Sequence, residues 1–207
     1  MVIRTRAPRG LTLVELLITF VMLLFLVGVM TLMTVRSKTV FQGAAAHSAA
    51  RQDLQTVLMK IAQEVKSTHK ALITDGSAIG KGAFSFMAAT DSNGRFITAA
   101  GGSLVWQKYV IYYIPAGTTT LLRREVYRDF TDPATNIPLT ASELATLCNG
   151  TGTTVMKTAQ KVSLTPDSNA TMSAAILHLQ TETVNQHGKR DTQSADLTVL
   201  LYNLKRK

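Results

Sequence analysis

The feature that most constrains this chain is a long uncharged apolar segment with one acidic residue at its start. From Leu16 to Val35 no residue carries a charge, and Glu15 directly precedes this run. At about 1.5 Å of rise per residue, a helix of this length spans roughly 30 Å, enough to cross the hydrocarbon core of a bilayer. The segment therefore predicts a transmembrane helix over residues 11–35.

The carboxylate of Glu15 is costly to bury in such a helix. An acidic residue at the centre of a membrane helix costs about 2.5–3.5 kcal/mol on insertion scales. Acidic residues in these segments therefore usually have a cationic partner or a function. The alternative is a carboxylate that stays hydrated at the membrane interface.

The flank of the apolar segment predicts its orientation. Arg4, Arg6 and Arg9 are the charged residues among the first ten. Basic residues beside a membrane helix stay in the cytoplasm. Residues 36–207 are therefore expected on the opposite, exported side of the cytoplasmic (inner) membrane. A secretory signal peptide likewise has a basic head, an apolar helix and an exported body after it. The small residues 43–46 resemble the cleavage site of such a peptide. The apolar run is longer than the roughly 7–15 residues of a signal peptide, which favours a single-pass anchor.

The leader and the apolar segment meet in a specific motif. A short basic leader ends in Gly10, and Glu15 is the fifth residue after this glycine. This arrangement resembles the processing site of type IV prepilins and of the pseudopilins of type II secretion. In that family a membrane aspartic peptidase, the prepilin peptidase, cuts after the glycine and methylates the new N-terminus. The resemblance implies removal of residues 1–10 and N-methylation of Leu11, although most members have phenylalanine where this chain has leucine.

The same resemblance gives Glu15 a role in assembly. Pilin helices lie parallel and staggered in a filament, so the terminal amine of one subunit can meet the carboxylate of another. A low dielectric strengthens such a pair. The resemblance therefore implies that Glu15 sets register with the Leu11 amine of a neighbouring pilin or pseudopilin within the lipid bilayer.

Beyond the apolar run, the helical pattern continues over residues 36–76. Six apolar residues recur at spacings of three and four: Leu54, Val57, Leu58, Ile61, Ala62 and Val65. This spacing predicts a helix with one buried face, packed on a folded domain. Asp75 and Gly76 predict its end.

Residues 77–207 have the composition of a β-sheet domain, with apolar and β-branched runs between turn signals. Strands are expected over residues 83–88, 104–114, 119–127, 157–165, 174–183 and 195–204. The last strand is apolar on both faces and is expected to lie centrally. Thr140 and Glu143 match a capping box, which predicts a short helix ending near Cys148, followed by a loop over residues 149–154.

These elements predict an α+β fold of pilin-like architecture, a long N-terminal helix on an antiparallel sheet. The aromatic strand beginning at Trp106 and the following Leu121-Leu122-Arg123-Arg124 resemble W-type minor pilins and J-type minor pseudopilins. The helix segment 53–55 and the closing strand 196–204 fit the same group. The tip-most pseudopilin typically lacks the glutamate found here as Glu15, which argues against that identity.

The sequence contains no recognisable catalytic motif, so neither an enzyme nor a cofactor is expected. His47, His69, His178 and His187 have no metal-ligand spacing with each other or with Cys148, the single cysteine. Residues 91–94 predict a plain turn, because the later ligands of a calcium loop are missing. There is no nucleophile elbow, P-loop or paired-carboxylate motif.

The formal net charge is +9, and removal of the leader arginines lowers it to +6. A basic exported domain suits anionic surfaces or DNA. Lys205-Arg206-Lys207 has no interleaved aromatic residue and is a weak nucleic-acid signal.

Together these patterns predict a minor pilin or pseudopilin that helps to initiate or build a type IV pilus or a type II secretion pseudopilus. One alternative is a membrane-anchored exported ligand-binding or enzyme domain, which would keep residues 1–10 and need a polar pocket in the sheet. Another is a DNA-binding competence pilin. A mature chain that begins at Leu11 favours the pilin hypothesis, and one that begins at Met1 favours the anchored domain.

Overall fold

The computed structural model describes residues 12–91, 95–99, 104–127, 137–167, 173–184 and 190–201. The chain divides into two compact units, Met1–Ala45 and Ala46–Lys207. Helix α1 (Leu13–Val65) begins in the first unit and ends in the second. The second unit also contains a short 3₁₀ helix (Lys70–Leu72), helix α2 (Ala141–Leu147) and two antiparallel sheets. The α+β class predicted from the sequence is therefore confirmed.

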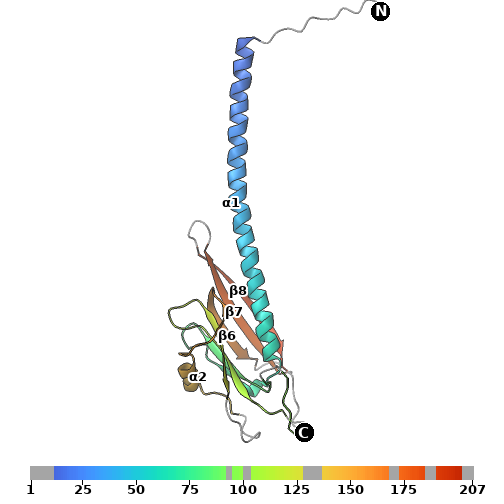
Figure 1. The fold of residues 1–207 in the computed structure, drawn as a ribbon, viewed down its shortest axis with the longest axis vertical. Helices are drawn as coiled ribbons and strands as arrows, with labels where there is room; N and C mark the ends of the chain where they lie inside the picture. The colour runs from blue at the N-terminus through green and yellow to red at the C-terminus, as the bar shows by residue number, and fades with distance from the viewer. Residues whose placement is uncertain are drawn as a thin grey trace, which may run out of the picture. The chain divides into compact units, whose positions relative to one another are not determined.

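The larger sheet is an antiparallel meander in chain order. Its strands are β1 (Ile73–Asp75), β2 (Ala83–Ala88), β3 (Lys108–Tyr113), β4 (Leu121–Tyr127) and β5 (Thr153–Met156). The smaller sheet has the order β6 (Ala159–Pro166), β7 (Ala174–Val184) and β8 (Arg190–Leu200), also antiparallel (Figure 1).

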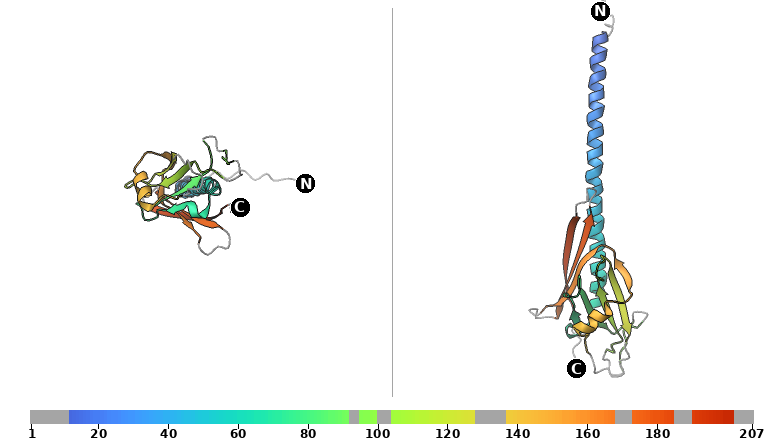
Figure 2. Two further views of the ribbon diagram at one scale, coloured as in Figure 1. Left: turned by 90° about the horizontal axis from the view of Figure 1, so that it is seen from below. Right: turned by 90° about the vertical axis from the view of Figure 1, so that its left-hand side faces the viewer.

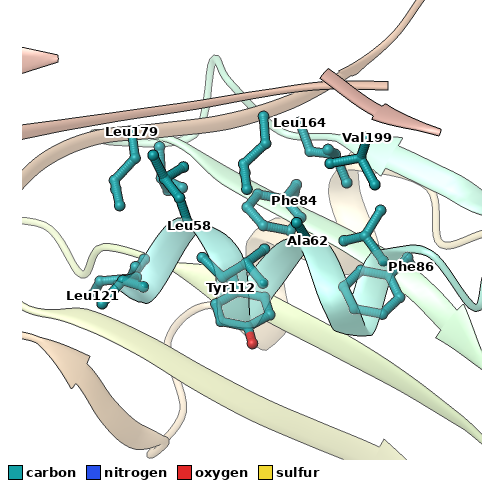
Figure 3. Close-up of a cluster of buried hydrophobic side chains, with 14 of the residues drawn as sticks. Leu58, Ala62, Phe84, Phe86, Tyr112, Leu121, Leu164, Leu179 and Val199 are labelled. Carbon is teal, nitrogen blue, oxygen red and sulfur yellow. The ribbon is translucent and has the colours of Figure 1, made fainter. Parts of the chain in front are cut away.

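The apolar stripe predicted on the second half of α1 forms the centre of the main core. All six stripe residues are buried. They pack with side chains from both sheets, as Figure 3 shows for Leu58 and Ala62 beside Phe84, Tyr112 and Leu179. The rings of Phe84 and Tyr112 are stacked, with centroids 5.2 Å apart. Burial of this stripe, rather than helix propensity, accounts for the stability of α1 beyond the apolar run.

The other face of the larger sheet carries a second core. Met87, Tyr109 and Ile111 pack there with Leu144 of α2. In Figure 2, α2 lies away from α1, with strands of the larger sheet between them. Every residue of β2 and β3 is buried because both faces of these strands are covered. This explains why their sequences are largely apolar rather than alternating, with Ser85 and Lys108 as the polar exceptions.

Helix α1 ends at Val65 rather than at Asp75–Gly76, where the sequence predicted its end. The four residues after Val65 are all polar, so the buried stripe stops there. The Ser67 hydroxyl also donates to the Glu64 carbonyl at 2.7 Å, which satisfies a carbonyl near the helix end. Ile73–Asp75 then pair with Phe84–Phe86 as β1, a strand that the sequence did not predict.

The last strand was predicted to be central, and this is wrong. β7 is the central strand, and among the described strands β8 pairs only with β7. Leu197 and Val199 face inward, as the alternation predicted, but Leu200 on the other face is 58% exposed. An apolar residue on the second face therefore did not mean that this face was covered. β8 also begins five residues earlier than predicted, at Arg190.

Several predicted elements agree closely with the structure. β2 has the predicted bounds, and β3 and β4 form the predicted hairpin, although β3 starts at Lys108 rather than at residue 104. The Thr140 capping box is present, and α2 ends at Leu147 with Cys148 as its C-cap, close to the predicted end. The loop predicted over residues 149–154 is only partly correct, because Thr153 begins β5 and pairs with Arg123.

Candidate functional site

Of the three residues expected at the N-terminal site, the structure describes one. Gly10 and Leu11, the expected cleavage and methylation positions, lie outside the described residues. Glu15 is described and lies in the first turn of α1.

Glu15 and Thr12 hold the start of α1 together. The Thr12 backbone N–H donates to Glu15 Oε2 at 2.9 Å, and the Thr12 hydroxyl donates to the same oxygen at 3.0 Å. The Glu15 N–H lies 3.3 Å from the Thr12 hydroxyl oxygen, which accepts its hydrogen bond. This reciprocal pattern is a capping box, which satisfies amide groups that the helix itself leaves unpaired. Glu15 therefore has a local structural role that the sequence analysis missed, although Thr12-x-x-Glu15 was a readable signal.

The polar side chains that follow Glu15 are satisfied within the helix. The hydroxyls of Thr19, Thr31 and Thr34 donate to the carbonyls four residues earlier, at 2.6–2.8 Å. These are the only hydroxyl-bearing residues between Leu16 and Val35. Such internal bonding suits a segment in lipid, where water cannot serve as a partner. By contrast, Oε1 of Glu15 has no partner in the part of the chain that the structure describes.

The apolar side chains of this segment are all open to the surroundings. Every large apolar residue from Leu13 to Val35 is at least 40% exposed. Helix α1 is long and apolar enough to cross a membrane, and its most apolar window is not buried against the rest of the protein. The first unit is therefore compatible with a single-pass membrane anchor.

The second unit contains a network of charged side chains at the end of α1. Glu64 Oε2 accepts hydrogen bonds from the Tyr112 hydroxyl and from Arg123 Nε, both at 3.0 Å. Arg123 also donates to Glu125 at 2.6 Å, and Lys108 donates to Glu125 at 2.9 Å. The Glu64 and Arg123 side chains are about three-quarters buried, and Lys108 is 6% exposed. The network therefore ties the last turn of α1 to β3 and β4.

The pKa values of the network follow from burial and from these partners. Burial and the Glu64 carboxylate raise the pKa of Tyr112 far above its usual range. Burial alone would raise the pKa of Glu125, but the hydrogen bonds from Lys108 and Arg123 outweigh it and lower this pKa. Burial opposes the charge of Arg123, yet Glu125 and Glu64 together raise its pKa above the usual value. Glu125 and Arg123 therefore stay charged at neutral pH.

Each of the three described histidines has a polar neighbour. His47 Nδ1 accepts a hydrogen bond from the Gln193 side-chain amide nitrogen at 3.0 Å and lies 3.4 Å from an Asp191 carboxylate oxygen, while His178 pairs with Asp196 across β7 and β8. His69 Nδ1 accepts a hydrogen bond from the Ala71 N–H. His187 lies outside the described residues. No group of three potential ligands occurs within the described ranges.

Cys148 caps the C-terminal end of α2 and is buried. Burial, partly offset by Arg124, raises the pKa of its thiol to about 11. A buried thiol that stays protonated at neutral pH behaves as a small apolar side chain.

The second unit also has two surface hollows. One is polar, has a volume of about 460 Å³ and lies between the segment before β2 and the three-stranded sheet. The other is apolar, has a volume of about 380 Å³ and lies between α2 and the strands β3 and β4. The sequence predicted neither hollow, since each brings together residues from distant parts of the chain.

Comparison with known proteins adds no further assignment. The chain matches no protein-family model, no curated protein and no solved structure.

Proposed function

We propose that this protein is a minor pilin or pseudopilin, a membrane-anchored filament subunit whose leader is removed after Gly10. The observation that carries the proposal is the state of Glu15. It is the one acidic side chain at the head of an apolar segment whose three threonine hydroxyls are satisfied within the helix, and one of its carboxylate oxygens has no partner among the described residues.

The capping box does not remove the need for a cation. Thr12 supplies two donors to Oε2, and both are neutral groups. A carboxylate in a low dielectric gains much more from an opposite charge than from neutral donors. Cleavage after Gly10 creates such a charge, the amine of Leu11. In a stagger of parallel helices, the amine of one subunit would reach Oε1 of the next.

The two units then have separate tasks. Before assembly, residues 11–35 anchor the chain in the cytoplasmic membrane, with the leader arginines on the cytoplasmic side. After assembly the same residues form the filament core. The second unit is exported and offers lateral contacts to other pilins or pseudopilins. Its core packs the second half of α1 against both sheets.

Filament incorporation tests this proposal. Cells that carry the native system are sheared, and the chain is quantified in the filament fraction and in the membrane fraction. We expect the native chain in both fractions and a Gly10→Val variant in the membrane alone, because a bulky residue blocks the peptidase. A Gly43→Val variant is the matched control, since this glycine lies outside residues 11–35 and nothing lies within 4 Å of a Cβ at that position. Equal incorporation of the Gly10 variant and the native chain would contradict the proposal.

A second candidate is supported by the polar hollow. A membrane-anchored ligand-binding domain needs a polar pocket, and the second unit has one of about 460 Å³. This candidate keeps residues 1–10 in the mature protein. The anchored-domain candidate therefore predicts a mature chain that begins at Met1 and is absent from the sheared filament fraction. The filament proposal predicts a mature chain that begins at Leu11 and is present in that fraction.

A further inference from the structure

The polar hollow of the second unit has features of a binding site that the filament proposal does not use. It is lined by the segment before β2 and by residues of β6, β7 and β8. Its volume of about 460 Å³ falls within the range of roughly 300–1,000 Å³ that is typical of small-molecule sites. Its lining is polar, which indicates a polar ligand.

A β-bulge brings two polar side chains to the same face. The pairing of β6 with β7 is irregular between Ala159 and Lys161, so that Gln160 is an extra residue. In a regular strand, Gln160 and Lys161 would point to opposite faces. Here both line the hollow. Bulges often re-aim side chains in this way beside functional sites.

A close backbone contact fixes the opposite wall. Gly82 has a φ of +108°, and a Cβ at this position would lie 1.9 Å from the Val162 carbonyl oxygen. The neighbouring Lys81 carbonyl accepts a hydrogen bond from the Val162 N–H at 3.2 Å. A residue other than glycine could not bring the two backbones this close. This contact places the Lys81 side chain at the hollow.

Lys81, Gln160 and Glu182 in the lining form a connected set of satisfied polar groups. The Lys81 ammonium donates to the Thr118 carbonyl at 2.8 Å and to the Gln160 side chain at 3.1 Å. Gln160 donates in turn to one oxygen of Glu182, and Arg190 lies 3.3 Å from the other. Both oxygens of the one acidic lining residue are therefore occupied, and its charge is neutralised.

Three further lining side chains have no such partner. Lys161 stands directly opposite Gln180 on β7, and Thr192 lies on the adjoining β8. Within the residues that the structure describes, none of their side chains makes a hydrogen bond or ion pair. Among the described residues, the lining thus combines an unpaired ammonium, amide and hydroxyl with a connected set of satisfied polar groups, and it carries an excess of positive charge.

We propose that this hollow binds a small polar molecule through an oxyanion, a carboxylate or a phosphate, that pairs with Lys161. Gln180 and Thr192 donate to the same group or to a neighbouring hydroxyl of the ligand. Charge-assisted hydrogen bonds of this kind are roughly twice as strong as neutral ones. The proposal does not depend on cleavage of the leader or on filament assembly.

Binding is tested on the purified full chain in detergent micelles by calorimetric titration. The probes are glucuronate, glucose 6-phosphate, inorganic phosphate and uncharged glucose. We expect at least one oxyanion probe to bind and glucose to bind at least about tenfold more weakly, since the charge-assisted contact is missing. Preference for glucuronate would assign a carboxylate ligand, and preference for a phosphate probe would assign a phosphate ligand. No binding of any oxyanion probe at about 10 mM would overturn the proposal.

Two variants locate the binding site. Lys161→Ala is expected to weaken oxyanion binding by about tenfold or more, and Gln180→Ala by a smaller factor. Lys60→Ala is the matched control, because it removes an exposed lysine on α1 that does not line the hollow. Equal affinity of the Lys161 variant and the native chain, or equal weakening by the Lys60 variant, would overturn the proposal. Because Lys161 is exposed, its variant is expected to fold, and circular dichroism checks this.

Discussion

Thr12 and Glu15 form reciprocal hydrogen bonds at the start of α1. The Thr12 N–H donates to the Glu15 carboxylate at 2.9 Å, and the Glu15 N–H lies 3.3 Å from the Thr12 hydroxyl oxygen. Glu15 therefore has two separable properties. Its oxygens cap the helix, and its charge is available to a partner. A glutamine keeps the first property and loses the second.

The first prediction uses this separation. Glu15→Gln is expected to insert normally and to lower incorporation into filaments at least about tenfold, as strongly as Glu15→Ala, because loss of one member of a buried ion pair costs about 3–5 kcal/mol. Thr12→Val, which removes a cap but keeps the charge, is expected to have the smaller effect of a lost cap, about 1 kcal/mol. The measurement is the fraction of each variant in sheared filaments. If Glu15→Gln assembles normally while Thr12→Val does not, Glu15 is a helix cap and not an assembly residue.

The second prediction concerns the contact between Glu64 and Arg123. The two side chains meet at 3.0 Å and are largely buried, so their effects on the free energy of unfolding should not be additive. A double-mutant cycle with Glu64→Gln and Arg123→Met is expected to give a coupling free energy of about 0.5–3 kcal/mol. The matched control pairs Arg51→Met, an exposed residue of α1, with Glu64→Gln and is expected to give a coupling near zero. Coupling near zero in the first cycle would show that α1 is not held to β4 through these charges.

The third prediction is a pH dependence caused by Glu125. Its pKa in the folded protein is lowered below the ordinary value of 4.5 by hydrogen bonds from Lys108 and Arg123 that outweigh the effect of burial. A group with a lowered pKa stabilises the fold above its unfolded pKa, and this stabilisation is lost as pH falls through the folded pKa. The measurement is chemical unfolding of the full chain in detergent at several pH values. The contribution of Glu125 to the free energy of unfolding should be constant near neutral pH and should decline below pH 4.5. Glu125→Gln should be less stable at neutral pH and should decline less steeply in acid. An identical acid decline in both proteins would exclude this origin.

The fourth prediction concerns the reactivity of Cys148. The thiol is buried and its pKa is raised to about 11, so little thiolate is present at neutral pH. Native protein at neutral pH should react with a maleimide far more slowly than denatured protein, by at least about a hundredfold, because both thiolate content and access are low. Mass spectrometry of the labelled chain measures the rate. Rapid labelling of the native protein would mean that the end of α2 opens readily.

The features that could be predicted from the sequence are those that depend on neighbouring residues. The capping box of Thr140 and Glu143, the buried stripe around Ile61 and the hairpin of β3 and β4 each depend on a short pattern. The capping box of Thr12 and Glu15 has the same local Thr-x-x-Glu pattern and was equally readable.

The remaining features depend on contacts between distant residues. β1 and β5 are short, and their pairing partners define them more than their own composition does. Arg123 meets Glu64 only because β4 lies beside the end of α1. The polar hollow similarly needs Lys81 and Lys161 to approach from separate parts of the chain. No local pattern marks these relationships in advance.

The mass of the intact protein, extracted from the membranes of cells that carry the native system, tests the central claim most directly. The account predicts a chain that begins at Leu11, with or without the mass of one added methyl group. Gly10→Val should retain the complete leader in the same measurement. A native chain that still begins at Met1 would contradict the account, because the amine that pairs with Glu15 would never form.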